Sequence, residues 1–175
     1  MARGTKIAKL LAVGLGSGLI ASWVMNQFQA GLSRAFEDAI EDEPKTPSRQ
    51  SNNGAEGPED ATMKAASRIV GSVLKKELTK EEKKKVGSVV HYAFGGGMGV
   101  LYSMAASVDP KVTRGFGTAF GTALFAVADE IAVPLLGLAK GPKEYPLSSH
   151  ASALAAHLVY GLTTESVRRV SMAVL

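Results

Sequence analysis

Four ionisable side chains stand inside otherwise apolar stretches of this sequence and could do chemistry together: His91, Asp129, Glu130 and His157. Imidazoles and carboxylates are the groups that most often carry protons or bind metal ions in proteins. A buried imidazole beside a buried carboxylate can exchange a proton near physiological pH. What these four groups do therefore depends on the surroundings that the rest of the chain gives them.

The surroundings are long apolar stretches, each of which is about 20 residues or more, enough to cross a hydrocarbon core of about 30 Å as a helix. They cover residues 10–33, 86–108, 115–139 and 145–164, and only Asp129 and Glu130 break the third. The mean hydropathy is only +0.09, because a polar segment, 34–85, lies between the first two. A soluble helical domain would need a polar face on most of its helices, and these stretches have almost none. We predict an all-α integral membrane bundle of four transmembrane helices.

Composition excludes several other classes of protein. The chain has no cysteine, so it has no disulfide framework and no thiolate metal site. The isoelectric point of 9.3 suggests a nucleic-acid partner at first sight. The basic residues, however, lie mostly at the ends of the apolar stretches, which fits lipid headgroups better. We therefore expect membrane lipids as partners, no nucleic acid and no cofactor. The basic N-terminus resembles a signal sequence, but it lacks a convincing cleavage site and is interpreted as a retained first helix.

Three regions follow from this pattern: 1–33 with the first transmembrane helix, 34–85 as a polar linker, and 86–175 with the other three. The transmembrane helices are predicted at about 9–28, 86–108, 115–138 and 149–169, and an interfacial amphipathic turn can continue the first through residue 40. In the linker, residues 43–60 are rich in Pro, Gly, Ser and Asn and are predicted to be disordered.

Two capping signals lie in the second half of the linker. Asp60 can cap a short amphipathic helix, and Thr79–Glu82 forms a capping box that opens the next helix. The apolar residues of the short helix are predicted to share one side: Met63, Ile69, Val70, Val73 and Leu74. That helix is expected to lie either on the membrane surface or against the bundle.

The sequence also contains two pairs of similar short segments, which suggest an internal repeat. HYAFG (91–95) matches HLVYG (157–161), and GSGLIA (16–21) is similar to GTALFA (121–126). Two hairpins of like direction would form a parallel duplication about an axis along the membrane normal. Glycines four residues apart predict close helix packing, because small residues let helix backbones approach in lipid. They are Gly14, Gly18, Gly95, Gly99, Gly117 and Gly121. A dimerisation face is the alternative use for these glycines.

Three of these segments resemble the YagU family of small bacterial inner-membrane proteins. They are VHYAFGGGMGVLYS (90–103), ADEIAVPLLGL (128–138) and AHLVYGLTTESVRR (156–169). The resemblance covers about half the chain. It leaves out segment 34–78, which looks specific to the lineage of this protein. It implies a multi-pass protein of the bacterial inner membrane, with a loose link to acid tolerance and no established catalytic residues.

Helix geometry places the candidate groups at a common depth, in the half of the bundle that faces the linker. Adjacent residues of a helix point about 100° apart, so Asp129 and Glu130 cannot share one partner. We expect Glu130 to point inward and Asp129 to face His157 or the headgroups. Pro134 cannot donate to the Glu130 carbonyl, so a kink is predicted there. At the opposite end, Glu165 and Arg168 can pair near the interface.

Three interpretations of the cluster remain open. It can be a buried polar clasp that holds the helices in register, a titrating group for proton sensing or relay, or a metal site. The spacing of the residues matches no standard metal motif, so no metal is predicted. The leading hypothesis is a non-enzymatic inner-membrane protein tied to acid or envelope stress. The alternatives are an accessory subunit of a larger membrane complex, which would dock or self-associate through the glycine faces, and a small membrane enzyme.

The orientation in the membrane is also open. Basic residues near the N-terminus favour a cytoplasmic N-terminus, whereas six lysines between residues 75 and 85 favour a cytoplasmic linker. Four crossings place the N-terminus and the linker on opposite sides of the membrane, so the two cannot both be cytoplasmic.

Overall fold

The computed structural model describes residues 3–38, 60–75 and 77–174, and these contain helices and turns but no strand. The predicted disorder at 43–60 falls almost wholly outside these ranges. The regular helices are α1 (Arg3–Asp38), α2 (Ala61–Leu74), α3 (Lys80–Val108), α4 (Thr118–Leu124), α5 (Val133–Leu135) and α6 (Leu147–Val174). Two short 3₁₀ segments and a π-helix complete the chain: η1 (Pro110–Gly117), η3 (Pro142–Glu144) and η2 (Phe125–Ala132).

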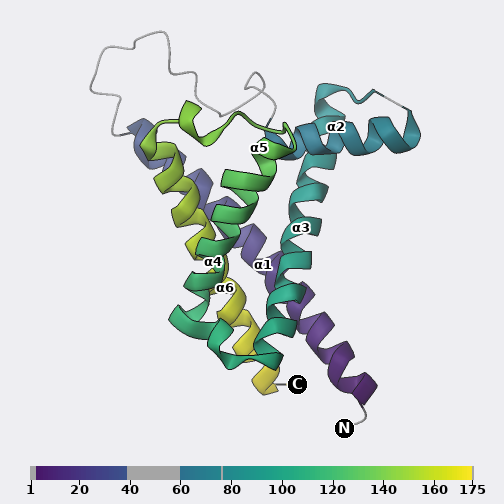
Figure 1. The fold of residues 1–175 in the computed structure, drawn as a ribbon, viewed down its shortest axis with the longest axis vertical. Coiled ribbons are helices and arrows are strands. Elements are labelled where there is room, and N and C mark those ends of the chain that lie inside the picture. The colour runs from purple at the N-terminus through teal and green to yellow at the C-terminus, as the bar shows by residue number, and fades with distance from the viewer. Residues whose placement is uncertain (1–2, 39–59, 76, 175) are drawn as a thin grey trace.

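The long helices run side by side between two ends of an elongated molecule (Figure 1). Both termini lie at the lower end, and α1 carries the chain upward. α3 returns downward, the composite of α4, η2 and α5 runs upward, and α6 returns again. α1 packs against both α3 and α6, while α4 packs on α6. The short helix α2 lies across the upper end, where it packs on α3.

The caps predicted between the linker and the second long helix are present. Asp60 is the N-cap of α2, and its carboxylate accepts the N–H of Met63 at 2.8 Å. Thr79 and Glu82 form the reciprocal capping box at the start of α3, which ends at Val108 as predicted. Local side-chain bonds of this kind stabilise helix ends without help from tertiary packing, which explains why the sequence reveals them.

The third predicted helix differs from the expected single helix over 115–138. Gly115 and Gly117 have φ of +65° and +87°, so the chain turns there and α4 begins only at Thr118. The backbone then widens into the π-helix η2, and the N–H of Val133 donates to the carbonyl of Ala128, five residues back. The regular helix stops at Leu135. Pro134 has no N–H with which to continue the α-helical hydrogen bonds, so the irregular backbone lies close to the predicted break. The kink at Pro134 stays a prediction.

The first and last helices extend beyond the transmembrane spans predicted for them. α1 runs over 3–38, which includes the interfacial continuation expected after residue 28, and α6 runs over 147–174 rather than 149–169. The extra turns of α1 carry polar and charged residues.

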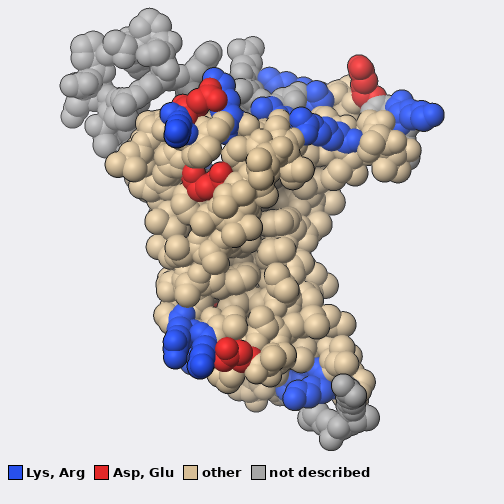
Figure 2. Space-filling view, viewed as in Figure 1, with Lys and Arg blue, Asp and Glu red and all other residues tan. Residues whose placement is uncertain are grey.

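Many more large apolar side chains are exposed than a water-soluble domain of this size would leave uncovered. The most completely buried positions include small or polar residues: Ser17, Ala21, Ser22, Ala66, Ser103, Ala156 and Thr164. Large apolar side chains face outward on every long helix: Leu15, Trp23, Val89, Leu101, Met104, Val127, Ile131, Leu162 and Val170. Charged side chains gather at the two ends of the visible face, and a mostly uncharged band lies between them, apart from a small acidic patch near the upper end (Figure 2).

Two helical segments of the described residues are long and apolar enough to cross a membrane, Gly4–Ala35 and Pro110–Leu135. In the second, only 11% of the apolar window is buried inside the protein. An exposed apolar surface of this extent needs a covering, which a lipid bilayer supplies. The two candidate spans therefore indicate a membrane protein by their length and composition.

Candidate functional site

Glu130 and His150 form the closest contact among the acidic and imidazole groups of the upper end. The Oε1 atom of Glu130 lies 2.6 Å from Nδ1 of His150, although the two residues come from different helices. The other ring nitrogen of His150 lies 2.9 Å from the carbonyl oxygen of Pro142. A carbonyl and an ionised carboxylate both accept hydrogen bonds, so the imidazolium form of His150, which has two N–H donors, satisfies both partners.

This contact, which we call the Glu130–His150 clasp, holds the connection between α5 and α6 against the bundle. Both side chains are 24% exposed, so the clasp is only partly shielded from its surroundings. The ring of Tyr145 meets the His150 ring edge-on at 6.4 Å between centroids. The clasp therefore joins the π-helix η2 to the segment that carries η3 and to the first turn of α6.

Asp129 lies near His157, but the pair makes no direct hydrogen bond. Oδ2 of Asp129 is 3.7 Å from Nδ1 of His157, which is beyond hydrogen-bond length. Nδ1 lies 2.9 Å from the carbonyl oxygen of Ala153, one turn back in α6, and is positioned to donate to it. The His157 side chain is only 8% exposed, whereas Asp129 is 39% exposed. This contact is a charge interaction across a gap and is looser than the clasp.

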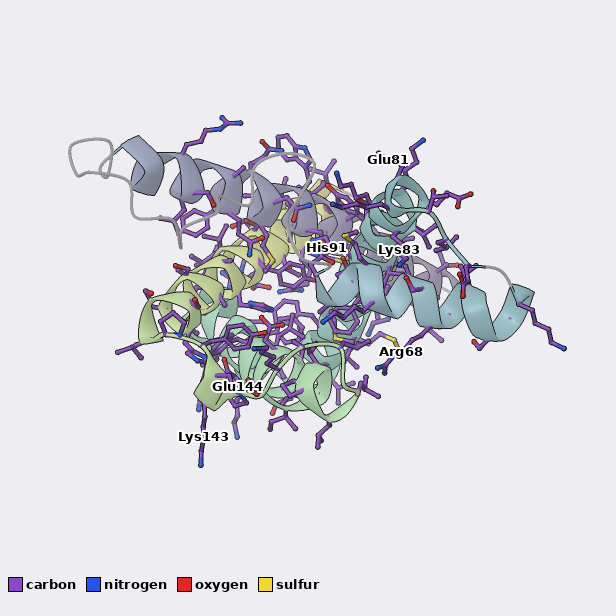
Figure 3. The ribbon with its side chains drawn as sticks, turned by 90° about the horizontal axis from the view of Figure 1, so that it is seen from above. Arg68, Glu81, Lys83, His91, Lys143 and Glu144 are labelled. Atoms are coloured by element: carbon purple, nitrogen blue, oxygen red, sulfur yellow. The ribbon has the colours of Figure 1, made fainter. Side chains whose placement is uncertain are left out.

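His91 stands apart from both carboxylates. Its Nε2 atom is buried, and no hydrogen-bond partner for it occurs in the part of the chain that the structure describes. Its ring meets the Tyr92 ring edge-on at 5.5 Å, and the Tyr92 hydroxyl accepts a weak hydrogen bond of 3.4 Å from Asn26. Seen from above, His91 lies among the helices of the bundle (Figure 3).

The partner of Glu130 was not found from the sequence. His150 follows the loop after the third apolar stretch, and a helix reaching residue 138 would have placed Glu130 far below it. Because α5 ends at Leu135, Glu130 lies only about 7.5 Å, five residues at 1.5 Å each, before the helix end. The signal that could have revealed the pair is the sequence SSH at 148–150, where the fourth predicted transmembrane helix begins.

A second charged cluster lies at the lower end of the bundle and centres on Glu165, which is fully buried. Arg168 donates to both carboxylate oxygens of Glu165, from Nε at 2.7 Å and from a terminal nitrogen at 2.9 Å. Arg169 donates from Nε at 2.5 Å, and the Tyr102 hydroxyl donates from α3 at 2.9 Å. The pairing of Glu165 with Arg168 was foreseen, whereas Arg169 and Tyr102 were not.

Aromatic rings complete this lower cluster. The guanidinium of Arg169 lies 4.6 Å from the centre of the Phe116 ring, and that of Arg168 lies 5.9 Å from the Tyr102 ring. Both distances are within the range of cation–π attraction. Both carboxylate oxygens of Glu165 thus accept hydrogen bonds from cationic donors, so the buried negative charge is well compensated, while Arg169 itself is half exposed.

Two close contacts between glycines bring the long helices together. At the first, a Cβ atom at Gly18 would overlap the carbonyl oxygen of Gly95 and approach the Cα atom of Gly99. Gly14 lies one turn away from Gly18 and meets Gly99 and Val100 in the same way. Only residues without a side chain allow α1 and α3 to lie this close.

The second contact joins η1 and α4 to α6. A Cβ atom at Gly117 would overlap the carbonyl oxygen of Gly161 and approach the Cβ atom of Glu165, and one at Gly121 would overlap the carbonyl oxygen of His157. Near this contact, Phe120 packs between Tyr102 and Tyr160, and the Tyr160 hydroxyl donates to the carbonyl of Gly95 at 2.5 Å. All six glycines singled out in the sequence lie at these two contacts.

The chemistry that this arrangement supports is proton binding. Within 3–38, 60–75 and 77–174, no three His, Asp or Glu side chains lie close enough to share a metal ion. The upper groups instead give two separate carboxylate–imidazole pairs, Glu130 with His150 and Asp129 with His157, and His91 belongs to neither. Imidazole is the side chain whose ordinary pKa lies closest to neutral pH.

Comparison with known proteins gives one match. Residues 40–166 match a family described as "Protein of unknown function (DUF1440)". The match runs through residues 40–78, the part of the chain that the YagU resemblance left out. No curated protein and no solved structure matches this chain.

Proposed function

This chain belongs to the DUF1440 family, and we propose that it is a non-enzymatic protein of the bacterial inner membrane with four crossings and a proton-responsive polar cluster. The observation that carries the proposal is the wide exposure of large apolar side chains on every long helix, beside an interior in which small or polar residues accompany Tyr102 and Tyr160. In such a setting an acidic group is costly, so carboxylates that persist among apolar helices have a use. The family description assigns no reaction.

The helix lengths support four crossings. At 1.5 Å per residue, α3 and α6 are about 43 Å and 42 Å long, more than a hydrocarbon core of about 30 Å. These two are less apolar than the two candidate spans, because they supply many of the glycines, hydroxyls and histidines of the interior. In a four-span bundle such helices are shielded from lipid by their neighbours, and their polarity is tolerated there.

The glycine contacts support an internal duplication. Gly18 lies against Gly95 and Gly99, and Gly117 lies against Gly161 and Glu165. Gly95 and Gly99 follow His91 by the same spacing with which Gly161 and Glu165 follow His157. These contacts relate Gly18 to Gly117, a different register from the one that GSGLIA and GTALFA would give. The two halves would then be related by an axis along the membrane normal.

The Glu130–His150 clasp is the part of the cluster best suited to respond to pH. α6 begins at Leu147 at the upper end of the molecule, where charged side chains gather (Figures 1 and 2), and it is about 12 Å longer than the hydrocarbon core, so we place its first turn, with His150, toward the headgroups. There the hydrogen bond with Glu130 raises the pKa of His150 above its ordinary value of 6.5. The clasp therefore contributes its full stability below about pH 6.5 and loses it as the pH rises through the raised value. Protonation of His150 therefore holds the connection between α5 and α6 against the bundle, and its deprotonation weakens that contact.

The crossing number can be tested with single cysteines, because the natural chain has none. Cysteines at Asn52, Lys143 and Asp109 would be labelled with a membrane-impermeant maleimide in cells and in inverted vesicles. We expect Asn52 and Lys143 to react from one side of the membrane and Asp109 from the other. Reaction of all three from the same side, or recovery of the chain without detergent, would contradict the four-span proposal.

The proton response can be tested in cells that lack the chromosomal copy of the gene. A Glu130→Gln, His157→Ala double variant should restore less survival after acid shock than the wild-type chain does. Glu144→Gln is the matched control, because Glu144 is an exposed carboxylate that pairs with Lys140 at 3.5 Å and lies outside the cluster. If the double variant folds normally and protects cells as well as wild type does, the cluster has neither a structural nor a proton-linked role. Equal loss from Glu144→Gln would also count against it.

A further inference from the structure

The short helix α2 presents different contacts on each of its sides. Met63 and Ala66 are buried where α2 meets α3, and Met63 lies beside Gly87. On another side, Arg68 donates to the carbonyl oxygens of Leu136 and Gly137, just beyond the end of α5. Figure 3 shows Arg68 on the edge of α2 that faces α5. Arginine suits this position, because unpaired carbonyls at a helix end carry partial negative charge.

Of the remaining two sides of α2, one faces the chain that returns to α3 and the other is apolar and exposed. Ser67 and Gly71 line a recess with Glu77, Leu78 and Lys83, so the chain returning to α3 lies over this side. Val73 is two residues beyond Gly71 and therefore points about 200° away from it. Ile69 lies one turn before Val73, and these two side chains are 52% and 73% exposed. An apolar edge is thus left open on the side away from the returning chain.

The open edge adjoins the apolar outer surface of the bundle. α2 lies across the upper end of the molecule, where the charged side chains gather and the uncharged band begins (Figures 1 and 2). The stretch 60–85 carries eight Lys or Arg residues and four Asp or Glu residues, so its net charge is positive. An amphipathic helix with an apolar edge and surrounding lysines has the chemistry of a helix that binds anionic lipid.

We propose that α2 is an interfacial helix that binds an anionic phospholipid leaflet, with Ile69 and Val73 among the acyl chains and the neighbouring lysines at the phosphates. This inference rests on the proposed membrane location of the bundle and adds the lipid class and the contact surface. Arg68 holds the helix to the end of α5, and the π-helix that carries Glu130 directly precedes α5. Lipid contact at α2 is therefore connected through the backbone to the clasp.

Two matched cysteine variants test the proposal in the full chain. Val73→Cys carries a fluorescent label on the open apolar edge, and Gly71→Cys carries it on the opposite side, where no atom lies within 4 Å of the added Cβ. The protein is reconstituted in phosphatidylcholine vesicles with and without phosphatidylglycerol. With phosphatidylglycerol, the Val73 label should be quenched by a shallow spin-labelled lipid and should be several-fold less sensitive to aqueous iodide than the Gly71 label.

A third label separates failure of this inference from failure of the membrane proposal. Leu101 is 54% exposed on α3, within the apolar band, so a Leu101→Cys label should be quenched by spin-labelled lipid. If it is quenched while the Val73 label stays open to iodide, the α2 inference is wrong and the membrane proposal stands. If neither label meets lipid, both are wrong.

Two further outcomes would also overturn the lipid assignment. Protection of Val73 that appears only at high protein-to-lipid ratio would mean that a second copy covers the edge. Equal protection with and without phosphatidylglycerol would mean that anionic headgroups play no part.

Discussion

The two ends of the bundle each hold a glutamate, but the two glutamates differ in their burial and in their hydrogen-bonding partners. At the lower end Glu165 is fully buried and bound by Arg168, Arg169 and Tyr102. At the upper end Glu130 is partly exposed and bound by His150. Arginine keeps its charge at every physiological pH, whereas histidine gains or loses its charge near neutrality. The comparison teaches that the partner, more than the acid itself, decides whether such a site is permanent or adjustable.

The local backbone strengthens this difference. Glu165 lies in the unbroken helix α6, and its two arginines follow it by three and four residues, the spacing that places side chains on one helix face. Glu130 lies in a π-helix and takes its partner from a different helix, beyond a loop. The lower cluster therefore persists as long as α6 is folded, but the clasp depends on the position of the loop.

The largest effect is expected from Glu165→Ala. This change leaves two arginine charges and a tyrosine hydroxyl without their acceptor, and loss of one partner from a buried ion pair costs about 3–5 kcal/mol. Thermal unfolding in detergent should reveal it as a large fall in midpoint. Ser166→Ala is the control, because Ser166 is exposed and its hydroxyl donates to the carbonyl of Leu162 in its own helix. A loss at Glu165 no larger than that control would show that the lower end does not anchor the bundle.

A smaller effect is expected from Tyr102→Phe, which removes only the hydroxyl that donates to the charged Glu165. The cost should be about 1.5–3 kcal/mol, because hydrogen bonds to charged groups are stronger than neutral ones. Tyr160→Phe provides the matched comparison, since its hydroxyl donates to the neutral carbonyl of Gly95, and it should cost about 0.5–1.5 kcal/mol. Denaturation of both variants under one condition checks the order. Equal costs would mean that the charge of Glu165 adds nothing to its bond with Tyr102.

The smallest effect on stability, but the clearest dependence on pH, is expected from His150→Gln. In the wild-type chain, trypsin should cut after the exposed Lys140 and Lys143 more readily as the pH rises above neutrality, because His150 loses its proton and the clasp weakens. In the variant this change with pH should disappear, apart from the pH response of trypsin itself. A variant with the same pH profile as wild type would remove the distinction between an adjustable and a permanent end.

The sequence predicted those parts of the fold that depend on neighbours in the chain. Asp60 and the Thr79–Glu82 box begin their helices as expected, because each cap bonds a backbone N–H only three residues away. The end of α3 at Val108 follows from the Asp-Pro turn directly after it. The glycines singled out by spacing lie at helix contacts, since only a residue without a side chain permits such an approach.

The partners of the acidic groups could not be predicted in the same way. Glu130 was expected well inside a helix that reaches residue 138 with a kink at Pro134, but the π-helix and the end of α5 at Leu135 bring it close to the loop. His150 was therefore missed, although His157 lies near Asp129. The bond between Tyr102 and Glu165 was likewise not predicted, because nothing in the stretch of sequence around Tyr102 reveals an acid on α6.

The amino-acid sequence alone determined the all-helical class, the helix caps and the concentration of apolar residues into long stretches, because these follow from hydrogen bonds and side-chain periodicity within a few residues. Only the tertiary structure decided which base meets which acid. That choice depends on the relative height and rotation of separate helices, and a shift of three residues at one helix end moves a side chain by about 4.5 Å, more than the length of a hydrogen bond.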